Sequence, residues 1–174
     1  MKGKRVRVVV GFILVCLLTG MLGVYSASAS TQIGLTYRLN DWGGLKIETQ
    51  SGFGGELLFE YDGETCEHMA VTELYLQPSV LYHFKGSSDT SPYVGIGYYS
   101  DRYTYENWGS EVDTESGIVL LAGLERFFGN VSCDLRASAY FTTWKEVWDS
   151  SEDQGTYAGI YVDLGVSVFA PTKS

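Results

Sequence analysis

The chain has 174 residues, among them three cysteines, with 12 Lys and Arg against 21 Asp and Glu and a formal net charge of −9. This length fits a single domain. The acidic balance excludes nucleic acid as an expected partner, because polynucleotide phosphates repel an anionic surface.

Residues 1–29 are organised like a bacterial signal peptide. An apolar run over 8–18 follows four basic residues and leads to the small-residue cleavage motif Ala27-Ser28-Ala29. Cleavage after Ala29 would remove those four basic residues and no acid, leaving 30–174 as one domain with a net charge of −13. An uncleaved membrane anchor is the alternative, because apolar character continues weakly to Tyr25.

After the leader, apolar and polar residues alternate with a period of two, which predicts β-strands. In chain order, strands are expected at 32–39, within 45–61, and at 72–84 and 92–103, each bounded by turn-forming residues. Pro78 lacks a donor for the strand ladder, so it is expected at a bulge or at a weak point in its strand.

The segment 45–61 can be read as one long strand or as two. Its alternation is unbroken, but the cluster Gly52-Phe53-Gly54-Gly55 favours a turn. Division at this cluster gives eight strands in total, an even number of the kind that single-chain bacterial barrels use.

The last three expected strands are 117–128, 131–141 and 157–169. Gly129-Asn130 predicts a tight hairpin between the first two. In contrast, 104–116 and 145–155 are expected to be long acidic loops, and the second of them contains the acidic surface cluster Asp149, Glu152 and Asp153. Short turns alternating with long loops are typical of outer-membrane barrels.

The two faces of these strands predict opposite surroundings. One face is mostly aliphatic and uncharged, which suits lipid, since an Arg at the bilayer midplane costs about 2–4 kcal/mol. The other face carries Glu125, Asp134, Arg136 and Asp163 among small residues. We expect these four side chains to form a charge network that closes a narrow barrel interior, as a plug rather than a pore.

The chain at this point resembles small bacterial outer-membrane barrels of the OmpA and OmpX type. The resemblance rests on the leader, on the strand-turn unit from Leu121 to Asn130 and on the closing strand 157–169. It implies an all-β fold, a closed antiparallel up-and-down membrane β-barrel of eight strands. It also implies location in the outer membrane of a diderm bacterium, with outer-membrane lipid and the barrel assembly machinery as partners. One departure is that Ala170–Ser174 follow Phe169, whereas such chains usually end on an aromatic residue.

Residues suited to catalysis or to binding a cofactor are few. His68 lies beside Glu67 in an expected loop and His83 lies at the end of an expected strand, so neither predicts a catalytic group. The acids at 149–153 do not have the spacing of a dedicated calcium loop. We therefore expect no enzyme activity, no cofactor and no metal centre, with weak divalent-cation binding by the acidic loops as the sharper alternative.

The sequence thus predicts an integral outer-membrane protein with a structural or surface-interaction role and an unidentified surface ligand. Two alternatives stay open. The first is an outer-membrane barrel enzyme that modifies lipids, and the second is a soluble, secreted ligand-binding β-barrel.

Overall fold

The computed structural model describes residues 31–39, 42–66, 69–84, 89–107, 109–148 and 151–170. The side chains of 64–66, 69, 106, 107, 109 and 110 are not described. The expected signal peptide and the tail after Ala170 lie outside these residues. Eight strands follow one another: β1 (Thr31–Arg38), β2 (Gly43–Thr49), β3 (Phe53–Cys66), β4 (Met69–His83), β5 (Thr90–Asn107), β6 (Gly109–Phe128), β7 (Val131–Trp148) and β8 (Ser151–Phe169).

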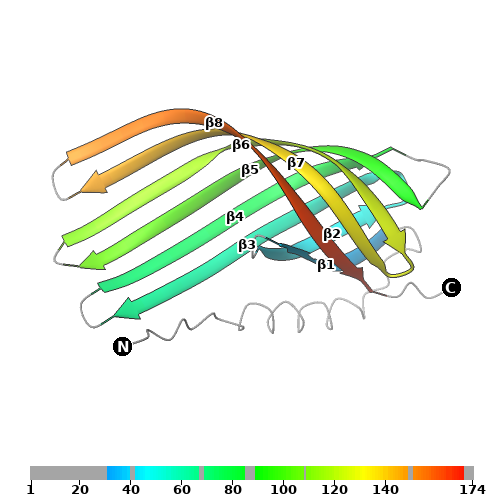
Figure 1. The fold of residues 1–174 in the computed structure, drawn as a ribbon, viewed down its shortest axis with the longest axis horizontal. Coiled ribbons are helices and arrows are strands. Elements are labelled where there is room, and N and C mark those ends of the chain that lie inside the picture. Colours follow the sequence, from blue (N-terminus) through cyan, green and yellow to red (C-terminus); the bar gives the residue numbers. More distant parts are fainter. Residues whose placement is uncertain are drawn as a thin grey trace.

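Each strand pairs antiparallel with its neighbours in sequence, and β1 pairs with β8 to close the ring (Figure 1). The eight-stranded up-and-down barrel expected from the sequence is confirmed. Two glycines make tight turns with left-handed backbone, Gly52 between β2 and β3 (φ 93°) and Gly129 between β6 and β7 (φ 69°). The division of 45–61 into two strands and the hairpin at Gly129 are therefore correct.

Pro78 lies inside β4 without a bulge. It pairs with Leu57 of β3 in an uninterrupted ladder. On the other side, pairing with β5 stops at Leu76 and resumes in the same register at Ser79. The strand therefore accommodates the proline by losing part of one ladder, because a proline has no N–H to donate.

The expected long loops at 104–116 and 145–155 are wrong, because these segments are strand. β5 and β6 pair as far as Asn107 and Gly109, and β7 and β8 pair as far as Trp148 and Ser151. Glu152 and Asp153 accordingly lie in β8 rather than in an acidic loop, and Asp149 lies outside the described residues. Residues with β propensity continue the pairing here, although the aliphatic side chains end.

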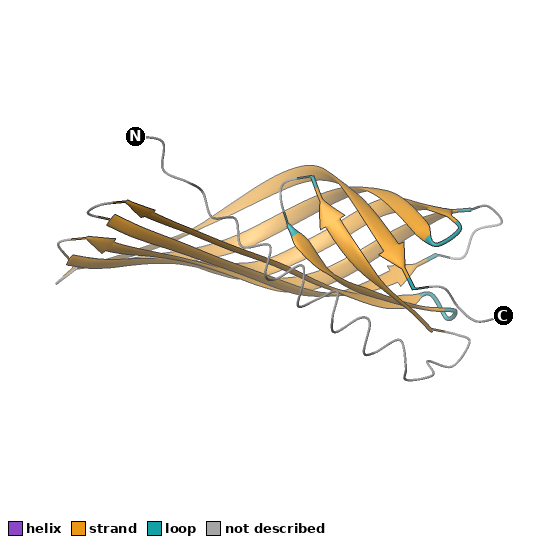
Figure 2. Cartoon of the chain, turned by 90° about the horizontal axis from the view of Figure 1, so that it is seen from below, coloured by secondary structure: helices purple, strands orange, loops and turns teal. Residues whose placement is uncertain are grey.

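Only part of each long strand belongs to the closed ring. β1 pairs with β8 only along Gly165–Phe169, and β2 pairs with β3 only as far as Phe59. Beyond that level β3 to β8 continue as a curved sheet with two free edges, which extends past the ring in Figures 1 and 2. We call residues 60–66, 69–75, 99–107, 109–117, 142–148 and 151–161 the projecting sheet.

No helix in the described part of the chain is long and apolar enough to cross a membrane.

Candidate functional site

The interior of the closed ring is filled by an ion network centred on Arg38. Its guanidinium donates from Nη1 to Asp134 Oδ1 at 2.7 Å and to Asp163 Oδ1 at 3.1 Å, and from Nη2 to Glu56 Oε1 at 2.9 Å. The side chains of Arg38 and Glu56 are completely buried. Alternation along β1, β3, β7 and β8 turns all four side chains inward.

Arg136 joins the same network from β7. Its Nη2 forms a salt bridge to Glu56 Oε2 at 2.6 Å, and its Nε donates to the Tyr93 hydroxyl oxygen at 2.9 Å. The Tyr93 hydroxyl in turn donates to Asp134 Oδ2 at 2.8 Å. Glu56 therefore bridges two guanidinium groups, and Tyr93 links Arg136 to Asp134.

A second cluster surrounds Lys46 nearer the Gly52 and Gly129 turns. Lys46 Nζ lies 2.5 Å from Glu125 Oε2 and 3.1 Å from Glu48 Oε1, and Ser132 also donates to Glu125. The ring nitrogens of His83 lie 3.5 Å from Glu48 and 3.7 Å from Glu125.

Glu48, His83 and Glu125 bring three potential metal-ligand atoms within 4.8 Å of one another. The ammonium group of Lys46 already contacts both carboxylates. Since it supplies the positive charge that a metal ion would bring, the donor set fits an ion pair better than a metal centre.

The four charged residues singled out in the sequence all lie in this interior, but not as one contiguous group. Asp134 and Asp163 bind Arg38, and Arg136 binds Glu56. Glu125 belongs instead to the Lys46 cluster. Sequence reasoning missed the residues that hold these groups together, which are Arg38, Lys46, Glu48, Glu56, His83 and Tyr93.

Those residues could have been found from the phase of alternation. Lys46 lies between Leu45 and Ile47, and Glu56 lies between Gly55 and Leu57, so both belong to the polar face of their strands. His83 shares the inward phase of β4 with Leu81, and it lies among the interior charges rather than in an interfacial aromatic cluster.

A layer of aromatic rings lies between the ion network and the projecting sheet. Trp42 stacks on Tyr75 with ring centroids 4.2 Å apart. Tyr140 meets Tyr99 edge-on at 5.1 Å and Tyr161 edge-on at 5.4 Å. The hydroxyl groups of Tyr75 and Tyr140 both donate to Gln77, so the layer is hydrogen-bonded as well as packed.

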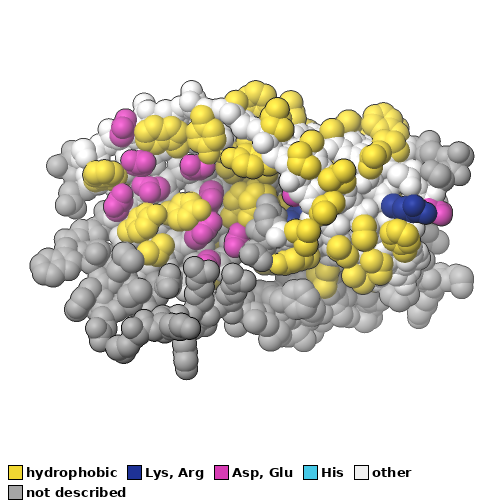
Figure 3. All heavy atoms as spheres, viewed as in Figure 1, with side chains coloured by type: hydrophobic (Ala, Val, Ile, Leu, Met, Phe, Trp, Pro, Cys, Tyr) yellow, Lys and Arg dark blue, Asp and Glu magenta, His cyan; other side chains and the backbone are white. Residues whose placement is uncertain are grey.

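Beyond this layer, the concave face of the projecting sheet carries acidic and aromatic side chains. Tyr103 donates to Glu73 Oε1 and Tyr157 donates to Glu115 Oε2, both at 2.7 Å. Figure 3 shows acidic side chains interleaved with hydrophobic ones over the projecting part, whereas hydrophobic ones dominate over the ring. Burial, together with the nearby charges of Glu73 and Glu115, raises the pKa of Asp101 to about 7.

The outward face of the ring is apolar over a limited height. It runs from 53 to 61 in β3, 74 to 82 in β4, 92 to 98 in β5, 118 to 124 in β6, 131 to 141 in β7 and 158 to 168 in β8. Exposed aliphatic side chains in these spans include Leu57, Val80, Ile96, Leu120, Leu135, Ile160, Val162 and Leu164. We call these spans the apolar band.

Above the apolar band, most outward positions are polar, with Val112 and Val147 as exceptions. Ser100 and Arg102 follow in β5, Ser116 and Thr114 in β6, and Thr143 in β7. Strand pairing continues through this change. The boundary is therefore a change of surroundings and not the end of the sheet.

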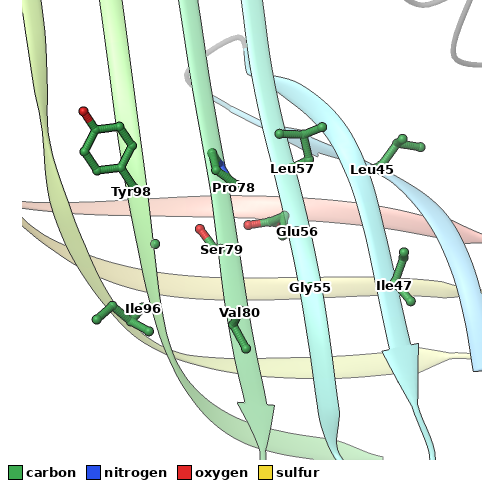
Figure 4. A pocket seen from close by; sticks show the side chains of 11 residues that line it. Leu45, Ile47, Gly55, Glu56, Leu57, Pro78, Ser79, Val80, Ile96 and Tyr98 are labelled. Atoms are coloured by element: carbon green, nitrogen blue, oxygen red, sulfur yellow. The ribbon is translucent and has the colours of Figure 1, made fainter.

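A shallow groove of about 560 Å³ crosses the apolar band between β2 and β5. Figure 4 shows Leu45, Ile47, Leu57, Val80, Ile96 and Tyr98 projecting from four neighbouring strands around it. Gly55 leaves the groove open because it has no side chain. Its apolar lining matches the rest of the band.

No protein-family model and no curated protein matches this chain. Several solved structures are similar to it, two of which are described here. One is a major outer membrane protein from Thermus thermophilus, with a TM-score of 0.45 and 13% identity, covering 80% of this chain and 99% of that one. The other is the N-terminal β-barrel domain of Pseudomonas aeruginosa OprF, with a TM-score of 0.43 and 17% identity, covering 83% of this chain and 100% of that one.

Proposed function

We propose that this chain is an integral outer-membrane β-barrel with a structural or surface-interaction role and no wide pore. The observation that carries the proposal is the inversion of polarity across the wall of the ring. Uncharged aliphatic side chains point outward, whereas Arg38, Arg136 and Lys46 point inward with their carboxylate partners. A soluble barrel would bury the aliphatic face and expose the charges.

The height of the apolar band supports a membrane location. In β7 and β8 it covers 131–141 and 158–168, and a tilted strand crosses a bilayer in about 9–11 residues. Each of these strands then continues beyond the band with mostly polar outward residues. The apolar band, which covers the ring and the first residues of the projecting sheet, therefore has the height of a bilayer, and the rest of the projecting sheet extends out of it.

The filled interior supports the absence of a wide pore. Arg38, Arg136, Lys46 and Tyr93 are among the largest fully buried side chains. An eight-stranded barrel has an interior just wide enough for side chains to fill. In planar bilayers we expect no conductance steps of the size that wide pores give.

The extension of the strands past one end of the ring supports an orientation. The turns at Gly52 and Gly129 are tight and lie at the end of the ring opposite the projecting sheet. Outer-membrane barrels place short turns in the periplasm and longer elements outside the cell. The projecting sheet accordingly faces the exterior, which is the basis of the proposed surface role.

The proposal is tested with an arginine placed at two heights on β8. Val162 points outward in the apolar band and is 70% exposed, and Thr156 points outward above it. Val162→Arg should cost about 2–4 kcal/mol of folding free energy in vesicles, and Thr156→Arg close to nothing. Urea titration, followed by the mobility difference between unheated and boiled samples, measures both. Equal small costs, together with a chain that stays dispersed without detergent, would favour the soluble ligand-binding barrel.

The lipid-modifying alternative requires a catalytic group that lipid can reach. His83 is buried, with both ring nitrogens facing Glu48 and Glu125, and His68 lies outside the described residues. Replacing His68 with Ala and measuring lipid modification in outer-membrane extracts distinguishes this alternative from the proposed role.

A further inference from the structure

Two rows of acidic and aromatic side chains cross the concave face of the projecting sheet from β3 to β8. Antiparallel register pairs neighbouring members of each row, and paired residues share one face. The outer row is Asp62, Glu73, Tyr103, Asp113, Glu146 and Asp153, and the inner row is Glu60, Tyr75, Asp101, Glu115, Trp144 and Gly155.

Carboxylates directly opposite one another destabilise a sheet, so such rows are costly without a counter-charge. Among the described side chains, the basic residues of the projecting sheet are on its other face: Arg102 alternates outward, and Lys145 pairs outside with Glu152 at 2.8 Å. Asp101 and Asp113 each keep a buried carboxylate oxygen without a hydrogen-bond partner. No described basic side chain of the projecting sheet thus faces these acids.

Aromatic rings lie among these acids. Tyr103 and Tyr157 each hold a carboxylate by a hydrogen bond from the hydroxyl group. Trp144 lies beside Glu115 in the inner row. An ammonium or guanidinium group over such rings gains a cation–π attraction in addition to its ion pair. This combination favours organic cations over metal ions.

The spacing of the carboxylates also disfavours a single metal ion. Among the described residues, the one group that brings three metal-ligand atoms within 4.8 Å is Glu48, His83 and Glu125, inside the ring. The outer row crosses six strands that lie about 4.8 Å apart, so it covers about 24 Å. An extended polypeptide of about seven residues has that length.

Among the described residues, the face is bordered by two free strand edges. β3 beyond Phe59 has no described partner on its β2 side, and β8 before Leu164 has none on its β1 side. A chain lying along the acidic rows can therefore enter and leave across the free edges without passing through the plugged ring.

From this arrangement we propose that the concave face of the projecting sheet binds an extended polypeptide segment rich in Arg and Lys. Its side chains would pair with the carboxylates of the two rows and lie over Tyr103, Trp144 and Tyr157. The inference rests on the proposed function, because an outer-membrane location presents this face to partners outside the cell.

The test uses an octa-arginine peptide with a fluorescent label and the barrel refolded in a neutral detergent, at low and at high salt. The concave-face variant combines Glu73→Gln, Asp113→Asn and Glu146→Gln, which keep side-chain size while removing charge. We expect peptide binding to weaken by at least about 10-fold, since each exposed ion pair contributes a fraction of that factor. Binding to the unchanged protein should also weaken as salt rises.

A matched pair of single variants controls for net charge and for folding. Glu146 lies on the concave face and Glu152 lies on the opposite face. Both are near the end of the β7–β8 hairpin. Glu146→Gln should weaken binding by about 2-fold or more, and Glu152→Gln should not. Trp144→Leu should weaken octa-arginine binding without moving the heat-shifted band, which reports the folded barrel.

Equal binding of octa-arginine by the unchanged protein and by the concave-face variant would overturn the proposal. Binding of Mg²⁺ or Ca²⁺ to this face without any binding of the peptide would also overturn it. Fractionation of the same samples separates this result from failure of the proposed function. A membrane-embedded, heat-modifiable barrel that does not bind the peptide would refute the peptide site alone. A chain soluble without detergent that still binds the peptide refutes the membrane role alone.

Discussion

Glu56 provides the sharpest test of the ion network in the ring. Its carboxylate forms salt bridges with Arg38 Nη2 at 2.9 Å and with Arg136 Nη2 at 2.6 Å, and its side chain is completely buried. Arg38 has further partners in Asp134 and Asp163. Glu56 is the carboxylate that forms a salt bridge with Arg136, so replacing it leaves that guanidinium without its ionic partner.

The expected cost follows from this difference. Glu56→Gln keeps the shape of the side chain but leaves a buried cation uncompensated, which costs about 3–5 kcal/mol. Adding Arg136→Met removes that cation and puts an apolar side chain in its place, so the double variant should regain most of the loss. The exposed pair of Lys145 and Glu152 is the control, and Glu152→Gln should cost less than about 1 kcal/mol.

Urea titration of the refolded protein in vesicles measures all of these values, with the heat-shifted band as the count of folded molecules. If Glu56→Gln lowers the free energy of unfolding by no more than Glu152→Gln does, water reaches the interior of the ring and solvates the ion network. If the double variant is less stable than Glu56→Gln alone, Arg136 stabilises the barrel by some contact other than its ion pair. Either result refutes the reasoning above.

Three further predictions concern backbone packing, orientation and pH. A Cβ atom at Gly117 would collide with the carbonyl oxygen of Phe141, so Gly117→Ala should lower the free energy of unfolding by about 1–3 kcal/mol in the urea titration. A Cβ atom at Gly43 would meet nothing within 4 Å, so Gly43→Ala should not destabilise the fold. Cys133 is a free, outward thiol in the apolar band. In a Cys66→Ser chain, a membrane-permeant maleimide should therefore label Cys133, and a charged maleimide should not. Equal labelling by both reagents would place Cys133 in water. Because the pKa of Asp101 is raised to about 7, its carboxylate is charged at pH 8 and protonated at pH 6, so octa-arginine binding should weaken between these values and Asp101→Asn should remove that step. Since the shift is upward, the same protonation stabilises the folded chain as the pH falls through about 7, and urea midpoints at pH 8 and pH 6 check the sign.

The ring could be predicted from the sequence because its apolar outward face and polar interior give a local pattern. In β8 the outward positions from Ala158 to Val168 are aliphatic and the inward ones are not, so one segment reports both faces. The strand number was predictable from Gly52, whose left-handed backbone marks a turn inside unbroken alternation.

The projecting sheet was missed because its alternation is of another kind. Above the apolar band most outward positions are not aliphatic, so Thr114 and Thr143 stand where Leu or Val stands below. Both faces then look polar, and a strand is mistaken for a loop. Threonine and tyrosine favour strands through their shape rather than their hydrophobicity, and that weaker indication was the one available.

The partners within the ion network could not be predicted from any local pattern. Arg38 and Asp134 are 96 residues apart in sequence, and they meet because the closure of β1 on β8 fixes the register of the whole ring. Phase along a strand shows that Lys46 and Glu56 point inward. Which carboxylate each cation meets depends on the tilt and stagger of all eight strands.

The distribution of charge gives a second, independent position for the proposed membrane boundary. Within the ring, acids lie beside cations, because an unpaired charge in a low-dielectric interior is expensive. In the projecting sheet, acids lie beside acids, and their repulsion costs less there because partly exposed charges interact through a medium of higher dielectric constant. The change from one regime to the other falls at the layer of Tyr75, Tyr99 and Tyr140. The continuous run of apolar outward residues ends at the same height, after Tyr98 in β5 and Phe141 in β7. The interior charges and the outward side chains thus mark the same boundary for different physical reasons. In a soluble barrel nothing would require the two changes to fall at the same height.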